Sequence, residues 1–301
     1  MKIVASGMSG LVGRHLALEL AKEHDLIRLV RRNTNGQSAA AQGGREVKWN
    51  PEEPGSWAKE IDGADAVINL CGEPIADKRW TEPRKRTLRN SRIRTTQALV
   101  RAIETAVVKP KVLLNASAIG YYGPRDHYLV DEETKAGVGF LTDLCMEWEK
   151  EALRAKDYKV RVVLLRTGII LSRDGGALKK MLLPFQFFLG GPLGDGRQYM
   201  SWIHIEDEIR AIQTALLDPM MQGPLNLTAP NPVTMDEFAR TLGKVLRRPS
   251  CFRVPEFILR GLLGELSEML LMGQKVYPQK LKRSGFQFRF ETLEEALKNL
   301  L

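Results

Sequence analysis

The residues with the clearest chemical role are three glycines near the start of the chain. The run Gly7-Met8-Ser9-Gly10-Leu11-Val12-Gly13 follows a short apolar segment and opens an amphipathic stretch. In a strand–turn–helix of this kind, the first glycine permits a tight turn, the second lets backbone approach a pyrophosphate, and the third lets helix and strand pack closely. Unpaired N–H groups at the helix start would then face the phosphates. The pattern predicts a dinucleotide site made of these seven residues, rather than a purely structural turn.

The end of the second apolar segment indicates which dinucleotide would fit. A carboxylate at this place would bind the ribose hydroxyls of NAD, but the sequence here is Leu29-Val30-Arg31-Arg32-Asn33. Two guanidinium groups can bind a 2′-phosphate through paired hydrogen bonds. Arg31 and Arg32 therefore favour NADP(H) as the cofactor. The alternative is a solvated pair of basic residues on the surface.

An alternation of strands and helices would position these residues. Short runs rich in Val, Ile and Leu predict strands at 2–6, 26–31, 66–70, 111–117 and 161–166. Amphipathic spacing predicts helices at 11–23, 84–107 and 140–156. The alternation predicts an α/β fold with a doubly wound parallel sheet that helices cover on both faces. The polar, glycine-containing stretch 33–46 is interpreted as a mobile loop.

The pattern changes after residue 166, where glycines and prolines interrupt it. Capping boxes at Thr234/Glu237 and Thr292/Glu295 predict two helix starts. An apolar stretch at 255–272 predicts a helix packed in the interior. We therefore expect a dinucleotide-binding domain at 1–167, rejoined by 201–220. A smaller, mostly α-helical domain would comprise 168–200 and 221–301, with a ligand cleft between the two.

Composition excludes several classes of protein. The 301 residues carry 45 Lys and Arg against 36 Asp and Glu, a net charge of +9, which suits an anionic ligand. Three widely spaced cysteines fit neither a disulfide framework nor a zinc site, and no HExxH or CxxC motif is present, so we expect no metal. No uncharged run is long enough to span a membrane and the N-terminus lacks a signal peptide, which predicts a cytoplasmic protein without a membrane partner. The basic run 78–94 has helical spacing, which favours a solvated helix face over nucleic-acid binding.

Further motifs occur along the chain in the order of a known family. They are Asn69-Leu70-Cys71-Gly72, Arg79-Trp80, Ser91-Arg92, Ser117-Ala-Ile-Gly-Tyr-Tyr-Gly123, Trp148-Glu149, Asp174-Gly-Gly-Ala177, Trp202-Ile-His-Ile-Glu-Asp207 and Gly273-Gln274-Lys275-Val276. With these motifs the whole chain resembles the atypical, extended-type short-chain dehydrogenase/reductases. It is most similar to their branch of "epimerase family proteins", which genome annotation links to nucleotide-sugar epimerases or a cell-division inhibitor.

The resemblance implies a Rossmann domain that binds NADP(H) and a C-terminal domain that closes over the nicotinamide. By position, Arg31 and Arg32 would face the 2′-phosphate, and Leu70, Cys71 and Gly72 would line the adenosine or ribose. Arg92 and Ser117 would lie near the cofactor, and Gly168, Ile169 and Ile170 would border the nicotinamide. The alternatives are a packing role for Cys71 and a surface helix charge for Arg92.

The family's usual catalytic residues are missing. Typical members use a Tyr-x-x-x-Lys pair, with a Ser or Thr, to exchange a proton with the substrate. The corresponding helix here has Leu141 and Cys145 at the pair's positions in one alignment, and Leu144 at the Lys position in the other. Ser117, Tyr121 and Tyr122 are the candidate replacements. Alternatively, solvent supplies the proton, or the two tyrosines pack under the cofactor.

Three residues of the second half are candidates for substrate contact. Arg197, in a glycine-rich loop, could bind a phosphate or carboxylate, or be an exposed charge. Trp202 and His204 lie in the segment that rejoins the first domain, where His204 could instead be a hydrogen-bonded anchor. Asp207 is expected to cap the next helix.

Two hypotheses on function follow. The first is an NADP(H)-dependent oxidoreductase or epimerase-like enzyme that acts on an unidentified small molecule. The second is a catalytically inactive NADP(H)-binding sensor or regulator, because the Tyr and Lys are missing. Either would be a monomer or a homodimer with no nucleic-acid partner.

Overall fold

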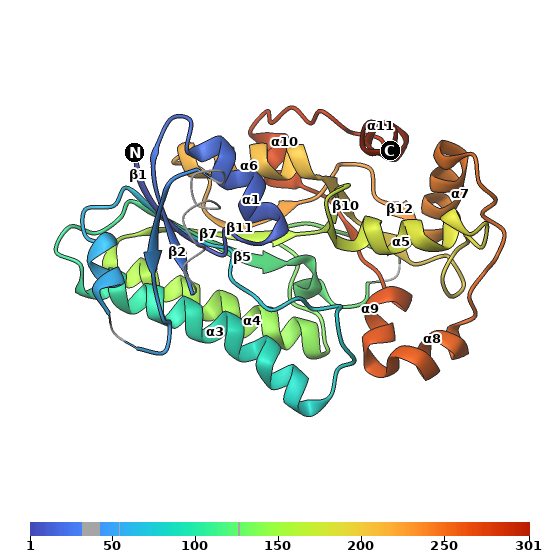
Figure 1. The fold of residues 1–301 in the computed structure, drawn as a ribbon, viewed down its shortest axis with the longest axis horizontal. Helices are drawn as coiled ribbons and strands as arrows, with labels where there is room; N and C mark the ends of the chain where they lie inside the picture. The colour runs from blue at the N-terminus through green and yellow to red at the C-terminus, as the bar shows by residue number, and fades with distance from the viewer. Residues whose placement is uncertain (32–42, 54, 126) are drawn as a thin grey trace.

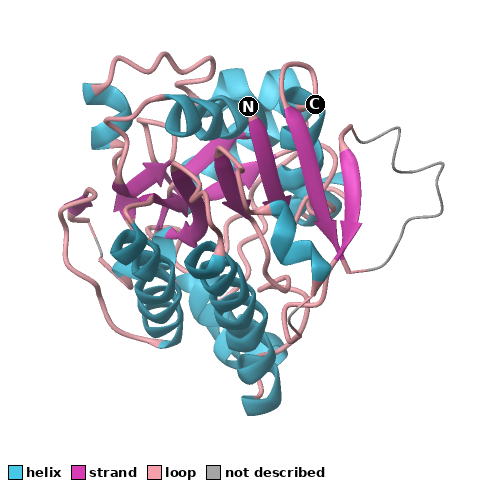
Figure 2. Cartoon of the chain, turned by 90° about the vertical axis from the view of Figure 1, so that its left-hand side faces the viewer, coloured by secondary structure: helices cyan, strands magenta, loops and turns pink. Residues whose placement is uncertain are grey.

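Seven parallel strands form the central sheet of the computed structural model, which describes residues 1–31, 43–53, 55–125 and 127–301 (Figures 1 and 2). Their order across the sheet is β11-β7-β5-β4-β1-β2-β3. The strands are β1 (Lys2–Ser6), β2 (Asp25–Val30), β3 (Arg45–Lys48), β4 (Ala66–Asn69), β5 (Val112–Ala118), β7 (Arg161–Thr167) and β11 (Gly223–Leu227). Crossover from β1 to β4 on one side and to β2 on the other creates a switch point at the carboxyl end of β1, where ligands bind in sheets of this type.

Helices cover both faces of this sheet. Figure 1 shows α1 (Leu11–Leu20) and α6 (Ile205–Leu217) on one side, and α3 (Glu82–Thr105) and α4 (Phe140–Leu153) on the other. Alternate residues of each strand enter opposite cores: Ile3 packs with Leu16 of α1, whereas Val4 packs with Leu99 of α3. The predicted α/β fold with a doubly wound parallel sheet is confirmed.

Two strands of the central sheet were not predicted from the sequence. β3 has only four residues, and its pattern of burial is partial because it is an edge strand. Arg45 and Glu46 belong to it, so the predicted loop 33–46 ends in a strand, and its residues 33–42 lie outside those that the structure describes. β11 contains Pro224, which an edge strand tolerates. It pairs with β7, so this stretch of the expected second domain extends the central sheet.

Shorter helices and strands make up the rest of the described structure. The helices are α5 (Gly176–Gln186), α7 (Met235–Leu246), α8 (Glu256–Leu263), α9 (Glu268–Leu271), α10 (Gln279–Arg283) and α11 (Leu293–Leu300), and the 3-10 helices are η1 (Ser56–Glu60), η2 (Ile119–Tyr122), η3 (Arg154–Tyr158) and η4 (Gly264–Ser267). Three two-stranded sheets join β8 (Ile169–Leu171) with β10 (Trp202–His204), β9 (Tyr199–Met200) with β12 (Val233–Thr234), and β6 (Leu129–Val130) with β13 (Lys275–Val276).

Helix starts test the capping predictions. Both predicted capping boxes are present, at Thr234 for α7 and at Thr292 for α11. The prediction that Asp207 caps α6 is wrong. His204 is the N-cap, and its Nδ1 accepts the N–H of Glu206 at 3.1 Å. Asp207 instead accepts the backbone N–H of Arg289 at 2.9 Å, which ties α6 to the segment before α11.

The predicted interior helix at 255–272 is also corrected. Gly264, with φ +60°, breaks the stretch into α8, η4 and α9. Leu259 is buried, but Phe257 and Leu262 are 74% and 63% exposed. Apolar residues thus occur on all sides of α8, but other parts of the chain do not cover all of those sides.

The part of the chain that the structure describes was also searched for membrane and metal features. None of its helices combines the length and the apolar composition needed to cross a bilayer. No group of three or more His, Cys, Asp or Glu side chains within it is placed to bind a metal ion. Cys71, Cys145 and Cys251 are free thiols.

Glu208, in the first turn of α6, is a carboxyl buried beneath the end of β7. The Thr167 hydroxyl donates a hydrogen bond to its Oε1 at 2.9 Å. Burial raises the pKa of Glu208 from 4.5 to about 8, so the folded protein holds this group protonated at neutral pH.

We expect Glu208 to make stability depend on pH. Its raised pKa means that stability is greatest below about pH 4.5, falls as pH rises to about 8, and is constant above. The slope contributed by one such group is at most about 1.4 kcal/mol per pH unit. Urea unfolding across this range should show the slope in the native protein and lose it in Glu208→Gln, which mimics the protonated group. Parallel curves for the two proteins would contradict this assignment.

Candidate functional site

The turn after β1 is held tightly against the end of β4. Gly7 has φ +80°, a conformation that favours glycine. A Cβ on Gly7 would lie 2.5 Å from the Leu70 carbonyl oxygen and 2.7 Å from the Cys71 nitrogen. The Gly7 carbonyl accepts the N–H of Gly10 at 3.1 Å, which closes the turn. Only glycine fits here, as the sequence predicted.

The start of α1 offers backbone donors to an anion. Gly10 is its N-cap, no side chain in the described ranges caps it, and its first turn has no acidic residue. Ser9 and Gly10 are exposed, whereas Gly13 is buried and a Cβ on it would lie 2.5 Å from Met8 Cα. The exposed N–H groups and the positive end of the helix fit a pyrophosphate. A Cβ on Gly10 would lie 3.4 Å from the Gly7 carbonyl oxygen, so packing within the chain does not require glycine at this position.

The segment after β4 forms a wall beside this turn. The side chain of Asn69 fixes it: its Oδ1 accepts the Ser6 hydroxyl at 2.9 Å and the Cys71 N–H at 3.2 Å. Its amide donates to Asn115 Oδ1 at 2.7 Å. Burial raises the pKa of the Cys71 thiol, which is therefore neutral and suited to packing. Contacts to a ligand from this wall would come from the backbone.

Arg92 supports the wall from behind. Its guanidinium donates to the carbonyls of Leu88 and Glu73, both at 3.0 Å, and lies over the Trp148 ring at 5.3 Å. A Cβ on Gly72 would be 3.0 Å from Arg92 Cζ. Burial lowers the pKa of Arg92. Arg92 is thus a half-buried positioning residue rather than a solvated surface charge.

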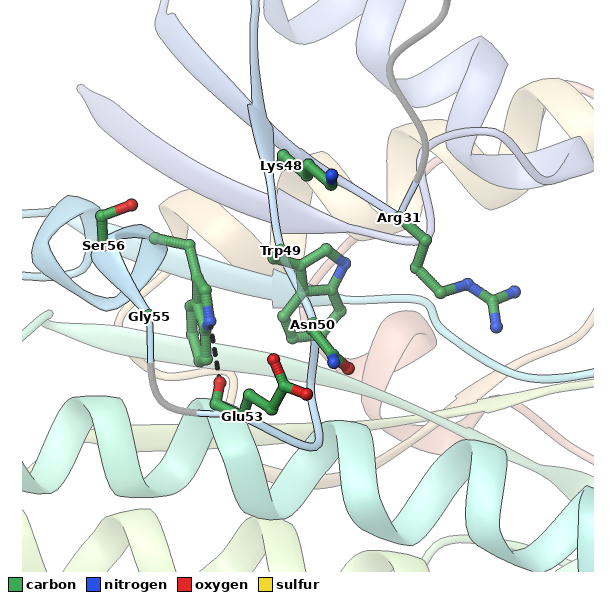
Figure 3. Close-up of a pocket in the computed structure, with 8 residues that line it drawn as sticks. Arg31, Lys48, Trp49, Asn50, Glu53, Gly55 and Ser56 are labelled. Atoms are coloured by element: carbon green, nitrogen blue, oxygen red, sulfur yellow. Dashed lines mark hydrogen bonds between the residues drawn. The ribbon is translucent and has the colours of Figure 1, made fainter.

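A pocket of about 350 Å³ lies at the carboxyl ends of β2 and β3. Its lining residues are Arg31, Lys48, Trp49, Asn50, Glu53, Gly55, Ser56 and Trp57 (Figure 3). The Arg31 side chain is exposed, with Glu73 as an ion-pair partner at 3.8 Å. Arg32 lies outside the described residues. Lys48 adds a second cation that the sequence analysis missed, because the short strand before it was not recognised.

The segment after β7 is brought close to the glycine turn. A Cβ on Gly176 would lie 3.1 Å from Leu11 Cδ2 and 3.7 Å from the Ile170 carbonyl oxygen. Gly168 is pressed against Ser201, whose carbonyl accepts the N–H of Ile169 at 2.8 Å. The half-buried residues Gly168, Ile169 and Ile170 therefore share one region with the start of α1.

Ser117 and Tyr122 belong to a buried polar network. Ser117 donates to Glu149 at 2.6 Å, and Arg166 donates two hydrogen bonds of 2.8 Å to the same carboxylate. The Tyr122 hydroxyl accepts from Arg166 at 3.0 Å and donates to Asn226 at 2.7 Å. All five side chains are buried, and burial raises the pKa of Tyr122 to about 12. In this conformation the Tyr122 hydroxyl has no surface for a ligand, which favours the packing alternative for it.

Tyr121 differs from its neighbour because it stays partly exposed. Its ring lies against Arg166, with 3.5 Å between Cζ and the ring centroid. The helix positions of the missing pair adjoin it: a Cβ on Gly120 would lie 3.1 Å from Leu141 Cβ and 3.9 Å from Cys145 Sγ. Burial raises the pKa of Cys145 to about 12, so the thiol cannot replace an ionised side chain. Tyr121 is the accessible phenol of the predicted pair.

The three candidate substrate residues are not brought together. Trp202 is fully buried and donates to the Asn231 carbonyl at 3.2 Å. His204 is buried against Phe290, 3.9 Å between ring centroids, and burial lowers its pKa. Both therefore act as anchors of the fold, as the alternative for His204 stated. Arg197 is exposed, as both of its interpretations allow.

This geometry agrees with comparisons to known proteins. Residues 3–226 match the NAD dependent epimerase/dehydratase family, and the chain belongs to it. Residues 254–300 match a domain of unknown function, DUF1731. The resemblance to epimerase family proteins that the motifs indicated is confirmed.

Individual relatives cover nearly the whole chain. "Epimerase family protein Mb2239" of Mycobacterium bovis is 44% identical over 98% of this chain and 96% of its own length. "Epimerase family protein SDR39U1 homolog, chloroplastic" of Arabidopsis thaliana is 40% identical over 100% and 87%. The crystal structure of human epimerase family protein SDR39U1 (isoform 2) with NADPH superimposes with a TM-score of 0.87, at 32% identity over 100% and 99% of the two chains. Since one relative is chloroplastic, the cytoplasmic location stays a prediction.

We expect Arg166→Met to destabilise the fold by about 3–5 kcal/mol, because it leaves the Glu149 carboxylate buried without its partner. The double variant Glu149→Gln with Arg166→Met should recover much of this loss, since it removes the unpaired charge. Urea unfolding of the three proteins measures both effects. A loss below about 1 kcal/mol for the single variant would contradict burial of the pair.

Proposed function

We propose that this chain binds NADP(H) across the carboxyl ends of β1, β2 and β4. The observation that carries the proposal is the uncapped start of α1 behind a turn in which Gly7 and Gly13 leave no room for side chains. The pyrophosphate would accept hydrogen bonds from the N–H groups of this turn. The backbone at Leu70 and Cys71 would line the adenosine.

The 2′-phosphate would lie beside Arg31. Lys48 lines the same pocket and adds a second positive charge, and Asn50 adds an amide (Figure 3). Arg32 follows directly in the sequence. The human relative solved with NADPH, at 32% identity over the whole chain, supports this choice over NAD.

We propose further that the chain is an oxidoreductase or epimerase-like enzyme for a small molecule. When bound, the nicotinamide supplies or accepts a hydride beside Gly168, Ile169 and Ile170. The smaller unit, with α5 and α8, would enclose the substrate. Tyr121 would exchange the proton, because it is the partly exposed phenol at the end of β5 and Arg166 fixes its ring. Ser117 and Glu149 would position Arg166.

A second function, that of a catalytically inactive NADP(H) sensor, is favoured by a different observation. The proton of Ser117 is donated to Glu149, and Leu141 and Cys145 present no ionised group where the family has its Tyr and Lys. In that case the site would bind the cofactor without turnover, and the bound state would be the signal.

The cofactor preference can be tested by calorimetry with NADPH and NADH. Arg31→Ala and Arg32→Asp should each weaken NADPH binding by about tenfold or more, because a charge-assisted hydrogen bond to the 2′-phosphate is lost. NADH binding should change little. Arg101→Ala, at an exposed position late in α3, is the control. Equal losses for both cofactors would place recognition of the 2′-phosphate elsewhere, and no binding of either would overturn the proposed function.

Tyr121→Phe tests the chemistry. In a screen of carbonyl compounds and nucleotide sugars with NADPH, any turnover of the native protein should fall by about 10²–10⁴-fold in this variant, while NADPH affinity is kept. Tyr128→Phe, which changes an exposed tyrosine, serves as the control. Turnover that survives Tyr121→Phe would exclude it as the proton donor. Binding of NADPH without turnover of any compound would favour the sensor.

A further inference from the structure

One end of the molecule exposes large apolar side chains on α5, on the turn that follows it, on α8 and on the segment that precedes α8. We define this apolar end patch by Leu183, Phe187 and Leu189 of α5 and its following turn, with Phe252, Phe257 and Leu262 of α8 and the segment before it. Each is at least half exposed, and Phe187 and Phe257 reach 69% and 74%. Figure 1 places α5 and α8 together at the right-hand end of the molecule.

Hydrogen bonds and an ion pair join the segments that carry these residues. The N–H of Phe252 donates to the Gly190 carbonyl at 3.0 Å, directly after Leu189, so the turn after α5 adjoins the segment that leads into α8. At the other side, Lys180 of α5 binds Asp77 at 2.8 Å, and Arg79 donates to the Leu262 carbonyl at 2.7 Å. Asp77 and Arg79 are two positions apart in the sequence, so their Cα atoms lie about 7 Å apart at most. The segments that carry the patch are therefore joined to one another on both sides.

Several cations surround the patch. Residues 176–189 and 247–262 together hold six Lys and Arg side chains, of which Lys180, Arg253 and Arg260 pair with Asp77, Asp236 and Glu256. Lys179, Arg247 and Arg248 are exposed, and no ion pair joins them to a carboxylate in the described part of the chain. Arg248 instead lies over the Phe188 ring at 4.1 Å. The positive charge is thus available to an external anion.

We propose that the apolar end patch docks the protein on the surface of an anionic lipid bilayer. Exposed Phe and Leu side chains on short helices, surrounded by Lys and Arg, can enter the headgroup region while the cations bind lipid phosphates. The occupant must supply both apolar contact and negative charge. A second copy of the chain supplies the apolar contact but would set the exposed cations Lys179, Arg247 and Arg248 of the two copies against each other. Docking of this kind needs no membrane-spanning helix.

Sedimentation with lipid vesicles tests the proposal on the full chain. The native protein should bind vesicles of phosphatidylcholine mixed with phosphatidylglycerol, bind vesicles of phosphatidylcholine alone far less, and dissociate as salt is raised. Phe187→Ser with Phe257→Ser should weaken binding by about tenfold or more, because two apolar side chains no longer enter the bilayer. Arg247→Glu with Arg248→Glu should also weaken it and reduce its dependence on salt.

Matched controls separate docking from general effects. Val107→Ser with Met220→Ser removes two side chains that are 86% and 83% exposed outside the patch and should leave vesicle binding unchanged. Circular dichroism checks that every variant is folded. The proposal is overturned if the native protein fails to bind the mixed vesicles or if the control pair weakens binding equally. It is also overturned if Phe187→Ser with Phe257→Ser leaves vesicle binding unchanged and instead dissociates a dimer or abolishes binding of a protein partner.

Discussion

A buried ion pair between Glu149 of α4 and Arg166 of β7 determines how the rest of the candidate site is arranged. Arg166 donates from Nε and Nη2 to Glu149 at 2.8 Å and from Nη1 to the Tyr122 hydroxyl, and Glu149 Oε1 also accepts the Ser117 hydroxyl. Removing charges from water costs several kcal/mol per ion, so such a pair persists only when its remaining hydrogen bonds are satisfied. In this chain Ser117 and Tyr122 make those hydrogen bonds, although a catalytic site at this place would otherwise use both residues. The polar groups at the end of β5 are therefore held by the fold, and Tyr121, outside the network, is left as the accessible phenol.

A second buried hydrogen-bond network lies on the cofactor side of the sheet. Asn69, Thr96 and Asn115 satisfy one another beneath the wall after β4, and Trp148 donates to Thr96 at 2.9 Å. Fully satisfied networks in a low-dielectric interior are rigid, because any shift leaves a buried group without a partner. The wall and the glycine turn thus form a fixed surface of backbone groups, which suits a ligand bound by its phosphates and sugars. The rigid wall and turn, together with the half-exposed phenol of Tyr121, favour a site whose first function is to bind a cofactor.

The sequence predicted those features of the fold that depend on residues close together in the chain. The glycine turn, both capping boxes and the five first-half strands follow from spacing of a few residues, and the structure has each of them within two residues of its predicted ends. Partners distant in sequence could not be predicted. Ser117 and Glu149 are 32 residues apart, and nothing in either segment indicates that one hydroxyl is already bound. β3 and Lys48 were missed because four half-exposed residues give no clear alternation. His204 is the cap because α6 begins at Ile205, which places Asp207 inside the first turn, where its carboxylate accepts the N–H of Arg289.

The error at 255–272 has a physical cause that bears on the surface of the molecule. Apolar residues around a whole helix call for burial on every side, yet Gly264 ends α8 after eight residues. Leu266 packs with Trp80 and Leu88 and anchors the segment through one side. Phe257 and Leu262 of α8 are left exposed to solvent. Single exposed apolar residues are ordinary, but contiguous aromatic and aliphatic groups are not, since each loses free energy in water. The exposed apolar residues of α8 therefore fit the proposed contact of the apolar end patch with a surface outside the chain, and the exposed cations Lys179, Arg247 and Arg248 favour a negatively charged one.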